Sequence, residues 1–167
     1  MLQPVLRRTW GPRGQRPIQR EWDCHDRLSV MSVITVSPQR RRLGLYWEIH
    51  GHNVHAGDVV RFLRDFHRQA TRRMVLILDR WQVHKAAAMR EFLQRHPRSI
   101  RVEWLPPYAP ELNPVEQVWN HTKYSDLPNL APDDIGQLHG LVYRSIKRQR
   151  SQSGLLRSFF QTAKLKL

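Results

Sequence analysis

Two acidic residues, Asp79 and Glu116, have types and positions that suit metal-dependent chemistry. Asp79 directly follows residues 74–78 (MVLIL), a short unbroken apolar run typical of a strand that is buried on both faces. Glu116 falls in the first turn of an expected helix that follows the next strand. Because parallel strands end at the same edge of a sheet, we expect both carboxylates to emerge there. The spacing therefore predicts that Asp79 and Glu116 converge.

Two converging carboxylates suit a hard divalent cation such as Mg²⁺ or Mn²⁺. The single cysteine, Cys24, excludes an internal disulfide framework and a cysteine-based zinc site. A pair of such ions can activate a water or a 3′-hydroxyl and stabilise the leaving oxygen in phosphodiester cleavage and joining. A purely structural reading stays open, because an Asp after a strand often forms a turn and an early helical Glu complements the helix dipole.

The elements that would position this pair alternate along the chain. Apolar and β-branched runs predict strands at 28–37, 43–50, 74–78 and 100–105. Helical periodicity predicts helices at 56–70, 85–96 and 115–123, and another that begins at residue 132. Residues 74–105 then form a right-handed parallel crossover. We expect an α/β fold in a single domain over 1–167, with a basic lead-in at 1–27 and basic C-terminal helices at 132–167.

Charge is the outlying property of the composition. The chain has 28 Lys and Arg against 14 Asp and Glu, a net charge of +14 and a pI of about 11.3. Such a surplus favours a polyanionic partner, and nucleic acid is preferred over a merely solvated basic surface. The cations that we expect to contact DNA are Arg7, Arg8, Arg41, Arg80 and Lys123. No apolar run is long enough for a membrane span, so we expect no membrane partner and a cytoplasmic location.

Three histidines, His50, His52 and His55, could be read as a metal cluster. The chain has nine histidines, so a chance grouping is the favoured interpretation.

One long stretch resembles a known family. The segment LILDRWQVHKAAAMREFLQRHP, followed by VEWLPPYAPELNPVEQVWNHTK, resembles the D-D-E transposases of the mariner-like superfamily, in particular their bacterial insertion-sequence branch. That family has a strand ending in Asp, a nearby His, and a motif of the form PPYSP-x-LNP-x-E-x-x-W with a Lys soon after. The upstream segment RRTWGPRGQRP resembles the one that follows the family's first catalytic strand. The resemblance implies a ribonuclease-H-like mixed sheet flanked by helices.

The resemblance also assigns roles to residues. The family's second and third acids fall on Asp79 and Glu116, which would be catalytic and would bind Mg²⁺ or Mn²⁺. His84 matches the family His, and Asn113 matches the Asn ahead of the glutamate. Arg80 departs from the pattern, because the family usually has Asn there. Its charge could compete with the metal or contact a phosphate.

A larger departure is the family's first Asp, for which we find no counterpart. In the family it ends the first strand, a few residues before the segment that begins here with MLQPVLRRTW. We therefore expect a sheet that lacks its first central strand, in a transposase catalytic-domain fragment that is inactive alone. Expected partners are the DNA of element ends and target, an intact transposase or a second copy. The alternative is a non-catalytic nucleic-acid-binding module that regulates an intact transposase; a product with no role is a third hypothesis.

Overall fold

The computed structural model describes residues 12–13, 27–70, 73–129 and 132–167. Its internal contacts divide the chain into two compact units. The first unit comprises the described residues up to His52 together with 114–167, and the second comprises 53–113. Asp79 therefore belongs to the second unit and Glu116 to the first.

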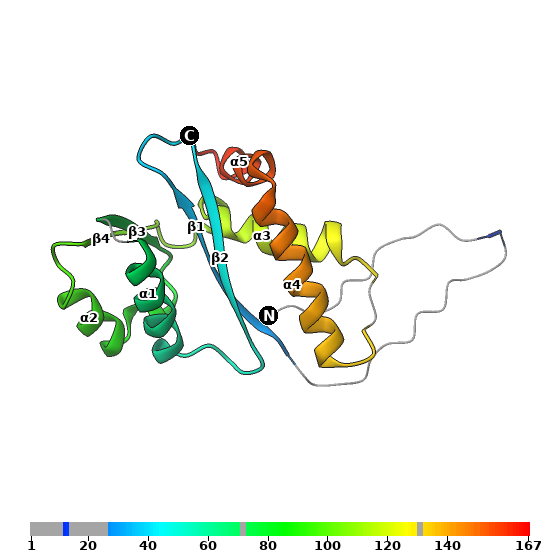
Figure 1. Cartoon of the computed structure of the whole chain (residues 1–167), viewed down its shortest axis with the longest axis horizontal. Helices are drawn as coiled ribbons and strands as arrows, with labels where there is room; N and C mark the ends of the chain where they lie inside the picture. The colour runs from blue at the N-terminus through cyan, green and yellow to red at the C-terminus, as the bar shows by residue number, and fades with distance from the viewer. Residues whose placement is uncertain (1–11, 14–26, 71–72, 130–131) are drawn as a thin grey trace. The chain divides into compact units, whose positions relative to one another are not determined.

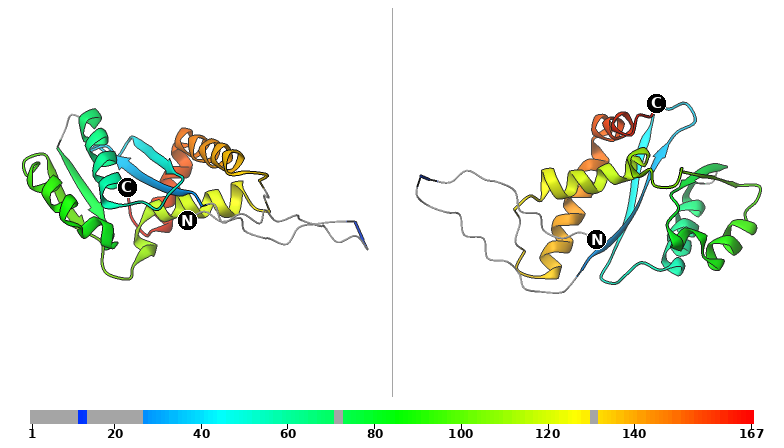
Figure 2. Two further views of the ribbon diagram at one scale, coloured as in Figure 1. Left: turned by 90° about the horizontal axis from the view of Figure 1, so that it is seen from below. Right: turned by 180° about the vertical axis from the view of Figure 1, so that it is seen from behind.

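The first unit is built on an antiparallel hairpin of β1 (Ser29–Val36) and β2 (Leu43–His50). The register pairs Ser29 with His50 and Val36 with Leu43. Three helices pack on this hairpin: α3 (Pro114–His121) contacts β1, while α4 (Ile135–Ser151) and α5 (Ser153–Thr162) contact β2 (Figure 1). Figure 2 shows from two further directions that these helices gather beside the hairpin.

Apolar side chains at helical spacing form the core of the first unit. On α4 they recur every four residues, so that one stripe of the helix faces inward. The buried cluster consists of Leu28, Leu45, Val118, Leu138, Val142, Ile146, Leu156 and Phe159. The start of α4 is set by Asp134, whose side chain accepts a hydrogen bond from the backbone N–H of Gln137 at 2.6 Å. This cap places the start of the helix three residues later than the sequence predicts.

A buried polar network joins the end of α3 to α4. Residues Thr122–Asp126 continue α3 as a π-helical turn (η3). Thr122 Oγ1 accepts a hydrogen bond from Gln149 Nε2 at 2.8 Å and lies 3.1 Å from Ser145 Oγ. Ser145 Oγ donates to Asp126 Oδ2 at 2.7 Å, and Arg148 forms an ion pair with Asp126 at 2.6 Å. These contacts fix the irregular turn against the neighbouring helix.

The second unit contains a parallel strand pair. It runs through α1 (Ala56–Ala70), β3 (Met74–Leu78), the 3₁₀ turn η1 (Gln82–Lys85), α2 (Ala87–Gln94), β4 (Ile100–Trp104) and the 3₁₀ turn η2 (Pro110–Leu112). The register pairs Met74 with Ile100 and Leu78 with Trp104. The parallel pairing predicted for residues 74–105 is therefore confirmed, with α2 as the connection. Among the described residues the strands form two two-stranded sheets, β1–β2 and β3–β4.

The prediction that both faces of β3 are buried is wrong. Leu76 and Leu78 face inward, whereas Val75 and Ile77 are 60% and 61% exposed. Opposite these two residues on β4 stand Arg101 and Glu103, which form an ion pair at 2.8 Å. The exposed face therefore has an apolar row on β3 beside a charged row on β4. The described helices are too short or too polar to cross a membrane.

Candidate active site

Asp79 and His84 meet in the loop that follows β3. His84 Nδ1 lies 2.9 Å from Asp79 Oδ1, and the same oxygen accepts a hydrogen bond from the backbone N–H of Trp81 at 3.0 Å. The turn η1 makes this possible, because the N–H of His84 donates to the carbonyl of Trp81 at 3.0 Å and folds the imidazole back. The Trp81 ring stands edge-on to the imidazole, with ring centroids 5.5 Å apart. The structure thus brings these two predicted site residues together.

The electrostatics of this loop favour an ionised Asp79. The hydrogen bond from His84 is the largest influence and lowers the pKa of Asp79 below its ordinary value of 3.8. Burial opposes this effect, while the Trp81 N–H and the charge of His84 reinforce it. The Asp79 side chain is 42% exposed and that of His84 is 15% exposed. The carboxylate is therefore charged at neutral pH, and the imidazole behind it is held in place.

One oxygen of Asp79 remains open for a ligand. Among the described residues, hydrogen bonds to the side chain reach Oδ1, and Oδ2 accepts none. A partly exposed carboxylate with one oxygen held by a histidine and no hydrogen bond to the other suits a divalent cation, whose ligands are themselves oriented by hydrogen bonds.

The side chain of Arg80 contacts the end of β4. Its Nε donates to the carbonyl of Leu105 at 3.1 Å, and the side chain stays exposed. The N–H of Leu105 in turn donates to the carbonyl of Leu78 at 2.8 Å, so Arg80 extends the β3–β4 pairing by one contact. The exposed guanidinium is still able to contact a phosphate, which stays a prediction.

Glu116 occupies the first turn of α3, as the sequence predicts. Pro114 begins this helix and Val118 is fully buried in the core of the first unit, which fixes the rotation of α3. Glu116 is partly buried. Since Asp79 belongs to the other unit, the convergence of the two acids stays a prediction.

The remaining predicted site residues have separate surroundings. Asn113 ends η2, where its N–H donates to the carbonyl of Pro110 at 3.0 Å. Lys123 lies in the π-helical turn and is partly buried. Arg41 is exposed in the turn between β1 and β2. Arg7 and Arg8 lie outside the described residues.

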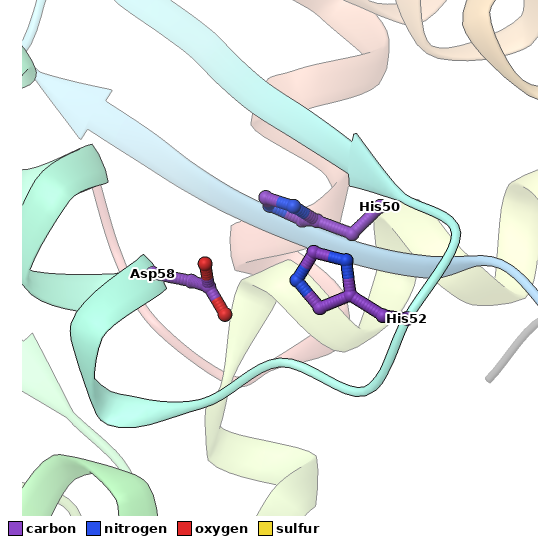
Figure 3. A group of neighbouring side chains, drawn as sticks. All are labelled: His50, His52 and Asp58. Carbon is purple, nitrogen blue, oxygen red and sulfur yellow. The ribbon is translucent and has the colours of Figure 1, made fainter.

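The three histidines of the WEIHGHNVH segment have local contacts. The rings of His50 and His52 meet edge-on with centroids 5.1 Å apart (Figure 3). His50 Nε2 also lies 3.3 Å from Glu48 Oε2. In the second unit, Asp58 accepts a hydrogen bond from the N–H of His55 at 2.9 Å and pairs with Arg61 at 3.2 Å. Asp58 therefore caps the start of α1.

The buried network around Thr122 was not anticipated from sequence. Its partners come from a helix 23 and 27 residues further along, so no local pattern points to it. A signal was present in the polar residues Ser145 and Gln149, which share the inward stripe of α4 with Val142 and Ile146.

The sequence and the structure are similar to known proteins of one kind. The family model for DDE superfamily endonuclease matches residues 1–139. The crystal structure of the Mos1 mariner paired end complex with Mn superposes with a TM-score of 0.63 at 16% identity, covering 98% of this chain and 48% of that chain. The catalytic domain of Mos1 mariner transposase superposes with a TM-score of 0.55 at 14% identity, covering 82% of this chain and 74% of that domain.

These similarities concern the fold of this chain and the share of a full transposase chain that it covers. They confirm the ribonuclease-H-like α/β class expected from sequence. The chain spans about half the length of the full transposase chain that it matches, at 48%. No curated protein is detectably similar to it in sequence.

Proposed function

Because the chain belongs to the DDE superfamily endonucleases, we propose that it is part of the catalytic region of a DNA transposase. Its intact parent cuts and joins DNA with divalent metal ions, and Asp79 and Glu116 supply two of the acidic ligands. Supporting this are the solved Mos1 complexes with Mn, with Mg and with a left transposon end. We also propose that the chain acts as a single catalytic domain.

The observation that carries this proposal is the contact between Asp79 and His84. A carboxylate at the carboxyl end of a parallel strand, with its pKa lowered and one oxygen open, is prepared to bind a hard cation. A carboxylate that served only as a turn residue would gain little from a partly buried histidine, because the Trp81 N–H already closes the turn.

Each residue has a distinct task in this proposal. Asp79 binds metal through Oδ2, and His84 holds the other oxygen so that the carboxylate keeps its orientation. Glu116 contributes its carboxylate from a helix whose rotation is fixed by Val118. When bound, the divalent ions supply activation of the attacking oxygen and charge stabilisation of the leaving oxygen.

Manganese binding tests the assignment independently of activity. Mn²⁺ titrated into the protein should broaden the ring signals of His84 before those of His139, which is exposed on α4. Asp79→Asn should remove this selective broadening. Asp65→Asn is the matched control, because Asp65 is half-exposed on α1 and pairs with Arg68. Equal broadening of His84 and His139 in the unmodified protein would remove the basis for a metal site.

A plasmid assay tests the expected inactivity. The resemblance assigns two of the family's acids, Asp79 and Glu116, to this chain, and two carboxylates by themselves hold two ions poorly. We therefore expect no nicking of supercoiled DNA with Mg²⁺ or Mn²⁺. Nicking that Asp79→Asn abolishes would contradict the inactivity while supporting the role of Asp79.

The net charge of +14 favours a second candidate function, a DNA-binding module that regulates an intact transposase. In that case duplex DNA binding should be salt-sensitive and should survive both Asp79→Asn and Glu116→Gln. A mobility-shift titration with the two variants, in the absence of divalent metal, measures this.

A further inference from the structure

The outward face of α4 is rich in cations. Val142, Ile146 and Gln149 are buried in the first unit, so the helical period turns the intervening residues outward. The exposed residues of this segment include Tyr143, Arg144, Lys147, Arg148 and Arg150. Arg148 is occupied by its ion pair with Asp126. Within the described part of the chain, Arg144, Lys147 and Arg150 have no carboxylate at ion-pair distance.

Aromatic rings from β2 and α4 lie beneath two of these cations. The guanidinium of Arg150 stands 5.3 Å from the ring centre of Tyr46 and 6.0 Å from that of Trp47. The ammonium of Lys147 is 5.9 Å from the ring centre of Tyr143. Trp47 and Tyr143 contact each other, with centroids 5.7 Å apart.

This arrangement reduces the freedom of the cations without neutralising them. A cation over an aromatic ring leaves a net positive charge at that place, whereas a cation paired with a carboxylate forms a neutral pair. Holding a long side chain in place before binding also lowers the entropy that is lost when a partner arrives. We call Arg144, Lys147 and Arg150, with Tyr46, Trp47 and Tyr143, the cation–aromatic face.

The helix that carries these cations contains no acidic residue of its own. From Ile135 to the end of the chain there are seven Lys and Arg and no Asp or Glu. Arg144 and Arg150 are six residues apart, which is about 9 Å along a helix. A DNA duplex presents about five phosphate charges over that length when both strands are counted. Three cations on this face can therefore meet phosphates at the same time.

We propose that the cation–aromatic face binds the phosphate backbone of duplex DNA, as a contact separate from the acidic residues of the proposed active site. The inference rests on the proposed function for the identity of the polyanion. Contacts of this kind position a protein on DNA and carry no sequence information. The face would therefore hold flanking or target DNA of any sequence.

The experiment measures duplex binding by fluorescence anisotropy over a series of KCl concentrations. The triple variant Arg144→Gln/Lys147→Gln/Arg150→Gln should flatten the slope of log K against log salt by roughly 2 to 3, since each phosphate contact contributes about 0.9. The matched control is Arg64→Gln/Arg90→Gln/Arg98→Gln, which removes three exposed arginines from the second unit. An equal change in both variants would mean that net charge alone matters, and it would overturn the proposal.

Two further variants separate charge from folding. Arg144→Lys/Arg150→Lys keeps the charges and should keep the slope, so a loss of slope there would count against a phosphate contact. Tyr143→Leu should weaken binding several-fold while Tyr143→Phe does not. If Tyr143→Leu binds duplex DNA as tightly as the unmodified chain, the aromatic ring does not hold the cation in place for binding. Circular dichroism melts identify any variant that fails to fold. If the triple variant fails to fold, the slope measured for Arg144→Lys/Arg150→Lys tests the proposal instead.

The outcomes distinguish this inference from the proposed function. If the triple variant binds DNA with an unchanged slope but still shows selective Mn²⁺ broadening of His84, only the cation–aromatic face is wrong. If the unmodified chain shows no such broadening but the triple variant flattens the slope, the metal assignment fails and the face stands. Loss of binding to vesicles of anionic lipid, with duplex binding unchanged, would assign the face to a membrane surface and overturn the proposal.

Discussion

The contact between Asp79 and His84 makes the charge of one carboxylate depend on one imidazole. Because the hydrogen bond from His84 is the largest cause of the lowered pKa of Asp79, His84→Ala should raise that pKa toward 3.8. A pH titration of the Asp79 carboxyl carbon by NMR measures the shift. His139→Ala, an exposed histidine on α4, should leave it unchanged. An identical Asp79 titration in protein with and without His84 would mean that the imidazole does not stabilise the charge.

The same shift sets a pH dependence of stability. The pKa of Asp79 is lower in the folded protein than its ordinary value of 3.8. The pair therefore stabilises the fold fully above that value, and the contribution is lost as the pH falls through the folded pKa. The difference in free energy of unfolding between the unmodified protein and Asp79→Asn should shrink below about pH 4. Urea denaturation at pH 7 and pH 3 measures it, and a difference that grows on acidification would contradict the sign.

Thr122 is the centre of the buried network between the π-helical turn and α4. Thr122→Val keeps the shape but removes the oxygen that accepts from Gln149 Nε2. The free energy of unfolding should fall by about 1–3 kcal/mol, the cost of leaving a buried polar group without a partner. Urea denaturation measures the change. The control is Thr162→Val at the exposed end of α5, where we expect a change within about 0.5 kcal/mol. An equal loss of unfolding free energy in the two variants would mean that the buried network stabilises the fold no more than an exposed hydrogen bond does.

At the scale of the element, the burial of β3 differs most from what the sequence predicts, because one of its two faces is exposed. Val75→Thr/Ile77→Thr should leave the free energy of unfolding within about 1 kcal/mol, because both side chains are largely exposed and Thr keeps the β-branch. The variant should also be more soluble, since it removes an exposed apolar row. Leu76→Ala on the buried face should instead cost about 2–5 kcal/mol. Precipitation by polyethylene glycol and urea denaturation give the two readouts, and a large destabilisation by the Thr pair would show that the row is covered in solution.

The elements that were predicted well are those with a strong local pattern. The strand at 43–50, the helix at 56–70 and the strand at 74–78 have the bounds that apolar periodicity predicts. The helix predicted at 85–96 instead begins at Ala87, because Ala86 is extended with ψ of 156° and the preceding residues form a 3₁₀ turn. The helix predicted at 115–123 changes to π geometry at Thr122, where hydrogen bonds to α4 decide the local structure. Local pattern cannot anticipate contacts made with a distant helix.

For the candidate site too, the sequence predicts where residues lie along the elements but not the contacts that their side chains make. The position of Asp79 directly after a strand and of Glu116 in a first helical turn followed from the sequence pattern alone. The contact of His84 with Asp79 depends on the η1 turn, and the residues QVHK have no strong turn signal. Arg80 was open to two readings, and the hydrogen bond to Leu105 that directs it to β4 became visible only in the folded unit.

At the scale of the whole molecule, the proposed function assigns Asp79 and Glu116 as ligands of the same metal ions, and this assignment predicts how their variants combine. If Asp79 and Glu116 bind the same ions, removing either acid should lower Mn²⁺ affinity nearly as far as removing both. Groups that act as a unit are strongly non-additive. We therefore expect Asp79→Asn, Glu116→Gln and the double variant to have similar Mn²⁺ dissociation constants, each raised at least tenfold. Free Mn²⁺ measured by electron paramagnetic resonance gives these constants.

The control cycle uses Asp65→Asn and Glu111→Gln, two exposed acids outside the proposed site. Each should change the affinity less than twofold, through the general loss of negative charge, and their effects should add. Additive losses from Asp79 and Glu116 would mean that the acids bind separate ions or none in common. A non-additive result would support the proposal that Asp79 and Glu116 bind the same ions, because an ion that needs both carboxylates is lost when either one is removed.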